Sequence, residues 1–164
     1  MSISTLVFAS TLFIIVVATI ITIEYGRVRN REFMSFRESI GLVDLPIVTF
    51  YQGETKLNFL LDTGANLSII DEKVVNSIET QVSETISTTI GIGKRINNIT
   101  NVDIKFLYKN KEFTDTFQVV DMSEAFGVIK KCSGVTMHGI IGNNFMQRYK
   151  YVLDFKEMIA YSQK

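Results

Sequence analysis

With 164 residues, the chain is long enough for one domain of ordinary size plus an extra segment, and its 17 basic and 17 acidic residues give no net charge that would attract nucleic acid. The single cysteine, Cys132, excludes an intrachain disulfide framework and a multi-cysteine metal site, and the single histidine, His138, leaves little scope for a histidine-based triad or a zinc centre. No glycine loop of the Walker or Rossmann kind is present, so hydrolysis by carboxylates is the chemistry that the composition still permits.

The first predicted element is an apolar helix. The run from Leu6 to Ile23 contains no charge, glycine or proline, and its length of about 18 residues just spans a bilayer core. A secretory signal peptide and a buried core helix are the alternatives. A signal peptide has a basic n-region, a shorter apolar stretch and a small-residue cleavage site, whereas Met1–Thr5 carries no basic side chain. We therefore expect residues 1–25 to form an uncleaved, single-pass transmembrane anchor.

Three arginines set the expected topology. Arg27, Arg29 and Arg31 follow the apolar run, so the positive-inside rule predicts that the rest of the chain is cytoplasmic. The unpaired Cys132 agrees with a reducing compartment. Residues 26–44 are mixed and charged, and we interpret them as a juxtamembrane linker.

The folded domain is expected over residues 45–164. Ile47–Tyr51 and Lys56–Leu61 are β-type runs separated by the hairpin sequence QGET. The second run then meets Asp62 inside the stretch LLDTGANLSII. Burying an unpaired carboxylate is costly, so Asp62 belongs either to a surface turn or to a site that needs its chemistry.

The residues after Asp62 favour a rigid turn followed by a hairpin arm. Gly64 lets the backbone turn sharply, and the Thr63 hydroxyl can cross-link neighbouring backbone, which would hold one carboxylate firmly at the end of a strand. Asp71–Ile78 is typical of one or two helical turns. Thr88–Asn98 has strand character with two glycines two residues apart, which suggests a mobile hairpin arm.

The remaining elements are predicted to be short strands. Val102–Tyr108 alternates between apolar and polar residues, KNK makes a turn, and Phe113–Val120 returns as another strand. Glycines flank Ile140 and Ile141 ahead of a short helix, and YVLDFKEMIAY is a final strand or hairpin. Many short strands with very little helix predict a small, closed β-structure.

Three motifs together resemble those of the retropepsin-like aspartic proteases. LLDTGANLSII, IGIGK and GIIGNNFM follow one another in the order and approximate spacing of that family, and the match extends from Leu45 to Tyr161. The resemblance implies an all-β fold, a closed retropepsin-like β-barrel with short helices. The apolar run places one N-terminal transmembrane helix before it. It also implies an active site between two identical subunits and a polypeptide substrate.

The resemblance assigns a role to each residue of the motifs. Asp62 is the expected catalytic aspartate, Thr63 would hydrogen-bond across the dimer, and Gly64 and Ala65 would shape the active-site loop. Ile140, Ile141 and Gly142 would brace that loop, and Gly91, Ile92 and Gly93 would form the flap over the substrate. Lys94 stands where many members have another glycine. The retroviral enzymes dimerise partly through interleaved free termini, whereas here the N-terminal side leads into the predicted anchor.

One Asp-Thr-Gly sequence supplies only one catalytic carboxylate. None of the other aspartates is followed by Thr-Gly or Ser-Gly, so the second carboxylate must come from Asp62 of another chain. Two carboxylates about 3 Å apart share one proton, and the ionised member takes a proton from water while the other hydrogen-bonds the scissile carbonyl. This mechanism requires no metal and no cofactor.

Other interpretations stay open. We prefer a membrane-anchored homodimeric aspartic endopeptidase; the alternatives are a non-catalytic peptide-binding module and a membrane signalling or assembly protein that cleaves one partner or its own linker. Asp62 could instead be an ordinary turn aspartate. His138 is predicted to be structural, and Cys132 to be an ordinary thiol. Three phenylalanines are core candidates first and substrate-pocket candidates second: Phe106, Phe113 and Phe117.

Overall fold

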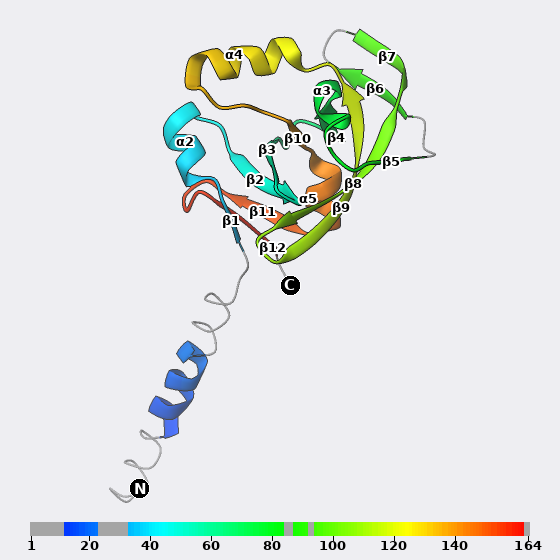
Figure 1. The fold of residues 1–164 in the computed structure, drawn as a ribbon. Helices are drawn as coiled ribbons and strands as arrows, with labels where there is room; N and C mark the ends of the chain where they lie inside the picture. The colour runs from blue at the N-terminus through cyan, green and yellow to red at the C-terminus, as the bar shows by residue number, and fades with distance from the viewer. Residues whose placement is uncertain (1–11, 23–32, 84–86, 92–93, 163–164) are drawn as a thin grey trace, which may run out of the picture. The chain divides into compact units, whose positions relative to one another are not determined.

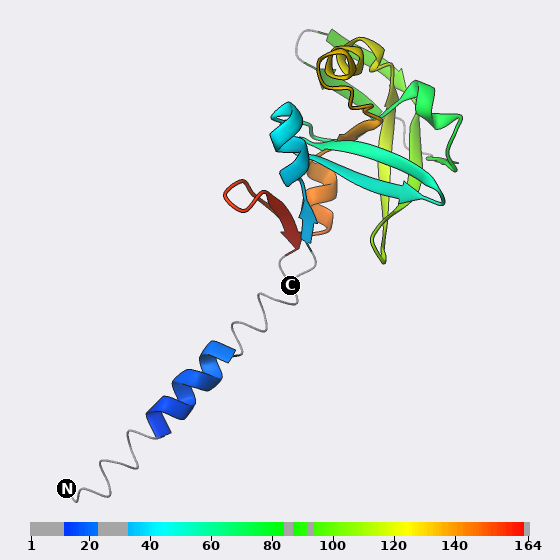
Figure 2. The same cartoon turned by 60° about the vertical axis from the view of Figure 1, so that its left-hand side comes forward.

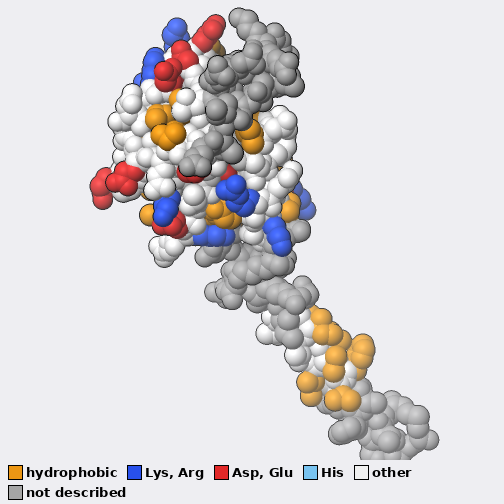
Figure 3. Space-filling view, turned by 90° about the vertical axis from the view of Figure 1, so that its right-hand side faces the viewer, with side chains coloured by type: hydrophobic (Ala, Val, Ile, Leu, Met, Phe, Trp, Pro, Cys, Tyr) orange, Lys and Arg blue, Asp and Glu red, His pale blue; other side chains and the backbone are white. Residues whose placement is uncertain are grey.

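The computed structural model describes residues 12–22, 33–83, 87–91 and 94–162. The chain divides into two units, Met1–Glu32 and Phe33–Lys164, which we describe separately. In the first unit, residues 12–22 form a helix with exposed apolar side chains, drawn in orange in Figure 3. No helix within the described ranges is long and apolar enough to cross a membrane. The rest of the predicted span, residues 6–11 and 23, lies outside those ranges, as do the three arginines that follow it.

The second unit consists mainly of strands (Figure 1). Its described strands are β1 (Phe33–Ser35), β2 (Ile47–Gln52), β3 (Thr55–Leu61), β4 (Ser68–Asp71), β5 (Gln81–Val82), β6 (Ser87–Gly91), β7 (Lys94–Ile99), β8 (Asn101–Tyr108), β9 (Lys111–Val120), β10 (Gly139–Ile141), β11 (Tyr151–Asp154) and β12 (Ile159–Ser162). Its described helices are α2 (Arg37–Val43), α3 (Glu72–Val75), α4 (Ser123–Ser133) and α5 (Asn143–Arg148).

The main sheet closes on itself. Its strand order is β2-β3-β10-β4-β9-β8-β5, and an additional pairing of Tyr51 with Leu107 joins β2 to β8. β10 is inserted between β3, to which it is parallel, and β4, to which it is antiparallel. The predicted closed β-barrel with short helices is therefore confirmed.

Aromatic side chains fill the barrel. Leu57, Phe59 and Leu61 point inwards from alternate positions of β3 and are at most 5% exposed. The ring of Phe50 on β2 packs edge-on against the rings of Phe59 and Phe106, with centroid separations of 5.8 and 4.9 Å. The core candidates predicted from the sequence are confirmed, because Phe106, Phe113 and Phe117 are all buried.

The compact unit begins earlier than the predicted boundary at residue 45. Part of the predicted linker forms β1 and α2, and β1 pairs with β12 to extend the terminal hairpin into a three-stranded sheet (Figure 2). Met34 and Phe36 are each only 1% exposed. The Ser39 hydroxyl of α2 accepts a hydrogen bond from the Ile47 amide at 2.8 Å, which attaches α2 to β2. The apolar pattern of β1 covers three residues, too few to be recognised among charged neighbours.

A further helix, α4, was not predicted. Only Phe126 of its side chains is buried, and Gly134 at its C-cap has the left-handed φ of 76° that commonly ends a helix. Phe126 packs with Ile47, Met137 and Ile140 in a second hydrophobic cluster outside the barrel core. Both α3 and α5 lie where short helices were predicted.

The predicted hairpins are confirmed. β2 and β3 join through Gly53 with φ of 55°, β8 and β9 are antiparallel neighbours, and β11 pairs with β12. The predicted arm corresponds to β6 and β7, which are antiparallel, with Gly91 opposite Lys94. Ile92 and Gly93, between those strands, lie outside the described residues.

His138 has the structural role that was predicted. Its Nδ1 atom accepts a hydrogen bond from the Asn58 amide at 3.0 Å, and its carbonyl accepts one from the Asp71 amide at 2.9 Å. An Nδ1 atom that accepts a hydrogen bond carries no proton, so the contact requires a neutral ring whose single proton is on Nε2. Burial lowers the pKa of His138, against an opposing contribution from the Asp71 carboxylate.

We expect the stability of the fold to depend on pH through His138. Because its pKa is lowered in the folded state, the unfolded state binds the proton more tightly. The free energy of unfolding should therefore fall as the pH drops below about 6.5 and through the lowered pKa. Urea unfolding of the full chain between about pH 7.5 and pH 5 should show a steeper decline for wild type than for His138→Gln. Parallel pH dependences for the two proteins would contradict this assignment.

Candidate active site

Asp62 stands directly after β3, where the strand leaves the barrel. Its amide donates to the Ile141 carbonyl at 3.0 Å, which extends the pairing of β3 with β10 by one residue. One carboxylate oxygen, Oδ1, accepts a hydrogen bond from the Gly64 amide at 2.8 Å. The side chain is half-buried. The turn therefore fixes the orientation of a carboxylate that solvent still reaches.

Gly64 is required for space rather than for a left-handed backbone. Positive φ values occur at Gly53 and Gly134 among the described glycines, and Gly64 is not one of them. A Cβ atom at Gly64 would lie 3.1 Å from Asp62 Oδ1, closer than most real Cβ contacts. The glycine lets its own amide approach the carboxylate.

The first turn of α5 holds the loop that carries Asp62. The Asn143 and Asn144 amides donate to the carbonyls of Ala65 and Asn66 at 2.8 and 3.1 Å. The Asn143 side-chain amide also donates to the Thr63 carbonyl, at 2.6 Å. Neither asparagine was given a role from the sequence, although both lie in the recognised GIIGNNFM motif.

The residues predicted to brace the loop lie next to it. Ile141 is buried in the barrel core, whereas its neighbour Ile140 faces the second hydrophobic cluster, against which Ala65 also packs. A Cβ atom at Gly142 would lie 2.6 Å from the carbonyl carbon and oxygen of Leu67. The backbone at Gly142 and the loop that carries Asp62 are therefore in direct contact.

Thr63 is exposed beside an open groove. The groove has a volume of about 600 Å³, and its lining combines the loop with α5, β11 and the turn after β11. Its lining residues include Thr63, Asn143, Met146, Val152, Leu153 and Phe155. No described contact brings Gly91 of the predicted flap to Asp62.

A second carboxylate, Asp115, lies behind the loop and is completely buried. Burial raises the pKa of Asp115, and this effect outweighs the opposing hydrogen bonds from Ser68 and Asn144 and the charge of Arg148. Within the described ranges, no three His, Cys, Asp or Glu side chains come together as a metal site.

The chain has recognisable similarity to known proteins. The family model described as retroviral aspartyl protease matches residues 43–154. Among solved structures, the chain is similar to the EIAV protease complexed with the inhibitor HBY-793, with 18% sequence identity, a TM-score of 0.48, and coverage of 68% of this chain and 93% of that chain. No curated protein matches.

The contact at Gly142 leads to a paired prediction. Gly142→Ala would push a methyl group into the Leu67 carbonyl, and overpacking of this kind typically costs about 1–3 kcal/mol of folding free energy. Gly127→Ala is the matched control, because nothing lies within 4 Å of a Cβ there and alanine in a helix should stabilise by about 0.5–1 kcal/mol. Urea unfolding of the two full-chain variants should show opposite shifts. Equal stability of Gly142→Ala and wild type would show that the loop yields easily at this point.

Proposed function

We infer the function from one premise: the chain belongs to the retroviral aspartyl protease family, whose model matches residues 43–154. Membership implies aspartic peptidase activity. We propose that the protein is an aspartic endopeptidase whose catalytic dyad consists of Asp62 from each of two identical chains. The main support is the geometry of Asp62, whose carboxylate is oriented at a strand end by the Gly64 amide and by the pairing of its own amide with Ile141.

The proposed reaction adds one water molecule across a peptide bond. Two Asp62 carboxyl groups close together share one proton, because like charges at that separation cannot both be ionised. The ionised group takes a proton from the attacking water, and the protonated group donates its proton to the carbonyl oxygen. Collapse of the tetrahedral intermediate breaks the C–N bond, and the leaving amine receives a proton from the dyad. The products are a carboxylic acid and an amine.

We place the proposed contact with a second copy of the chain at the groove beside Thr63. Thr63 is the next residue after Asp62, so a two-fold contact at this groove would bring the two Asp62 side chains close to the symmetry axis. Phe155 is 59% exposed at the groove, and β11 forms an edge of the terminal sheet. Apolar surface and a sheet edge are features that a second chain can cover. Both features support a homodimer.

We further propose that residues 6–23 attach the protein to a membrane, with the protease unit in the cytoplasm. The described helix over residues 12–22 supports this, because its large apolar side chains are exposed. The hydroxyls of Thr19 and Thr22 donate to the Ile15 and Ala18 carbonyls, at 2.8 and 2.7 Å. Hydroxyls bonded within their own helix need no water. The orientation rests on the arginines at 27, 29 and 31.

Mixing wild-type and Asp62→Asn chains tests the shared dyad. An amide can neither accept the proton of water nor share one, so a mixed dimer should lose about 100-fold or more of its activity. If the chains pair at random, an equal mixture should retain about one quarter of the wild-type rate, whereas independent monomers would retain about one half. The measurement is the initial rate on a quenched fluorogenic peptide library at several mixing ratios, after co-expression. A rate that falls linearly with the wild-type fraction would exclude a dimeric dyad.

Removing residues 1–25 tests the anchor. The deletion ends before the compact unit, which begins at Phe33. Confinement to one membrane raises the effective concentration of the chains, so the truncated protein should lose specific activity on dilution while the vesicle-bound full chain keeps it. Specific activity should be measured from micromolar to nanomolar protein with the same peptide library. Identical dilution curves would mean that the segment does not promote pairing.

A further inference from the structure

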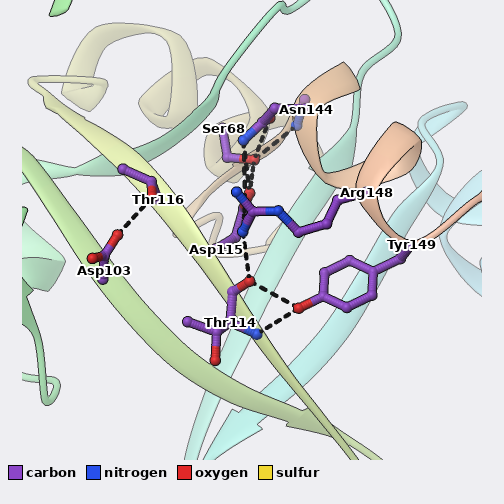
Figure 4. A network of polar contacts seen from close by, with 9 residues as sticks. Ser68, Asp103, Thr114, Asp115, Thr116, Asn144, Arg148 and Tyr149 are labelled. Carbon is purple, nitrogen blue, oxygen red and sulfur yellow. Dashed lines mark hydrogen bonds and ion pairs between the residues drawn. The ribbon is translucent and has the colours of Figure 1, made fainter. Parts of the chain in front are cut away.

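The carboxylate of Asp115 lies at the centre of a polar network in the barrel wall behind the catalytic loop (Figure 4). Its Oδ2 atom accepts a hydrogen bond from the Ser68 hydroxyl at 2.6 Å. The side-chain amide of Asn144 donates to both carboxylate oxygens at 3.1 Å, and an Arg148 nitrogen lies 3.2 Å from Oδ1. A buried charge is destabilising unless such partners compensate it, so the network and the carboxylate depend on each other.

Two of the hydrogen-bonding partners of Asp115, Ser68 and Asn144, also hold the loop that carries Asp62. Ser68 is the first residue of β4 after the loop, and its Oγ atom accepts a hydrogen bond from the Gly142 amide at 3.1 Å. The Asn144 backbone amide donates to the Asn66 carbonyl inside the loop, at 3.1 Å. Asp115 is therefore connected to the loop by two separate chains of hydrogen bonds, one through Ser68 and one through Asn144.

We propose that Asp115 is a positioning residue for Asp62: its buried carboxylate orients Ser68 and Asn144, which in turn fix the catalytic loop. This inference rests on the proposed protease function. Both oxygens of the Asp115 carboxylate accept hydrogen bonds from these side chains, and this sets the direction of each bond. The single Ser68 proton points to Asp115, which leaves the oxygen lone pairs for the Gly142 amide. The Asn144 side chain likewise presents its NH₂ group to Asp115.

Arg148 has a different part in the network. Its side chain is 51% exposed, so solvent screens its attraction to Asp115. The same nitrogen donates to the Thr114 carbonyl at 3.1 Å, and the Tyr149 hydroxyl donates to that carbonyl at 2.9 Å. These contacts attach the C-terminal end of α5 to β9. The orientation of the loop therefore depends on Ser68 and Asn144 rather than on Arg148.

Exchanging the carboxylate and the amide gives a sharp test. Asp115→Asn removes the acceptor-only group and should lower kcat on a quenched fluorogenic peptide by about 10-fold or more, with KM changed less than about threefold, because a small displacement of a catalytic group is costly. The double variant Asp115→Asn with Asn144→Asp returns one carboxylate to the network. Because Asn144 Oδ1 already lies 3.2 Å from the Ser68 hydroxyl, the double variant should recover most of kcat.

Asp103→Asn is the matched control. Asp103 lies on the neighbouring strand β8 and accepts a hydrogen bond from the Thr116 hydroxyl at 2.6 Å, but none of its described contacts reaches the loop (Figure 4). This variant should keep kcat within about twofold of wild type, as expected for a site remote from the chemistry. A loss in Asp103→Asn equal to that in Asp115→Asn would overturn the proposal.

Hydrogen exchange of the full chain gives a readout that needs no activity. Asp115→Asn should speed amide exchange in residues 62–68 relative to the β2–β3 hairpin. The double variant Asp115→Asn with Asn144→Asp should restore the protection of residues 62–68. If wild type cleaves no peptide but this exchange pattern holds, the protease function fails and the control of the loop by Asp115 stands. If exchange in residues 62–68 is unchanged, or rises equally in the hairpin, or the double variant restores nothing, the positioning role is wrong.

Discussion

The rest of the site depends on the insertion of β10 between β3 and β4. This insertion brings the Ile141 carbonyl to the Asp62 amide and places Gly142 against the loop that carries Asp62. Only glycine fits at the start of β10, because a Cβ atom at Gly139 would lie 2.3 Å from the Ile69 carbonyl oxygen and 2.6 Å from a ring carbon of Phe59. This close backbone approach thus allows β10 to join β3 to β4 and to meet the Asp62 amide.

Two carboxylates within one site have opposite requirements. Asp62 is half-buried, so solvent reaches its carboxylate, and the Gly64 amide donates to one of its oxygens. Asp115 is completely buried, and three side chains satisfy its oxygens. Burial raises the pKa of Asp115 because the charged form loses hydration. In the proposed mechanism, the buried Asp115 carboxylate orients the loop that carries the solvent-accessible Asp62 carboxylate.

The sequence predicted those elements whose apolar pattern or motif extends over several consecutive residues. Alternation over several residues predicted β3, β8 and β9, and the Asp-Thr-Gly motif identified the loop. β1 and α4 were missed because each buries too few side chains to show a period. Asp115 did leave a signal, since it occupies the inward position between Phe113 and Phe117, where an apolar residue is expected. Its partners come from distant segments, so its role could be recognised only in the folded chain.

Strands β1 and β12 lie outside the residues that the family model matches, and they change the entropy cost of forming the proposed dimer. The match ends at residue 154, and beyond it β12 pairs with both β11 and β1 of the same chain. In the retroviral enzymes that the motifs resemble, free termini interleave between subunits. Here the terminal strands are already ordered within one chain, so their conformational entropy is lost on folding rather than on association. The affinity of the proposed dimer would then depend mainly on covering the groove beside Thr63. The chain connection from β1 back to residues 1–32 would not interfere, because such a dimer exchanges no strands between subunits.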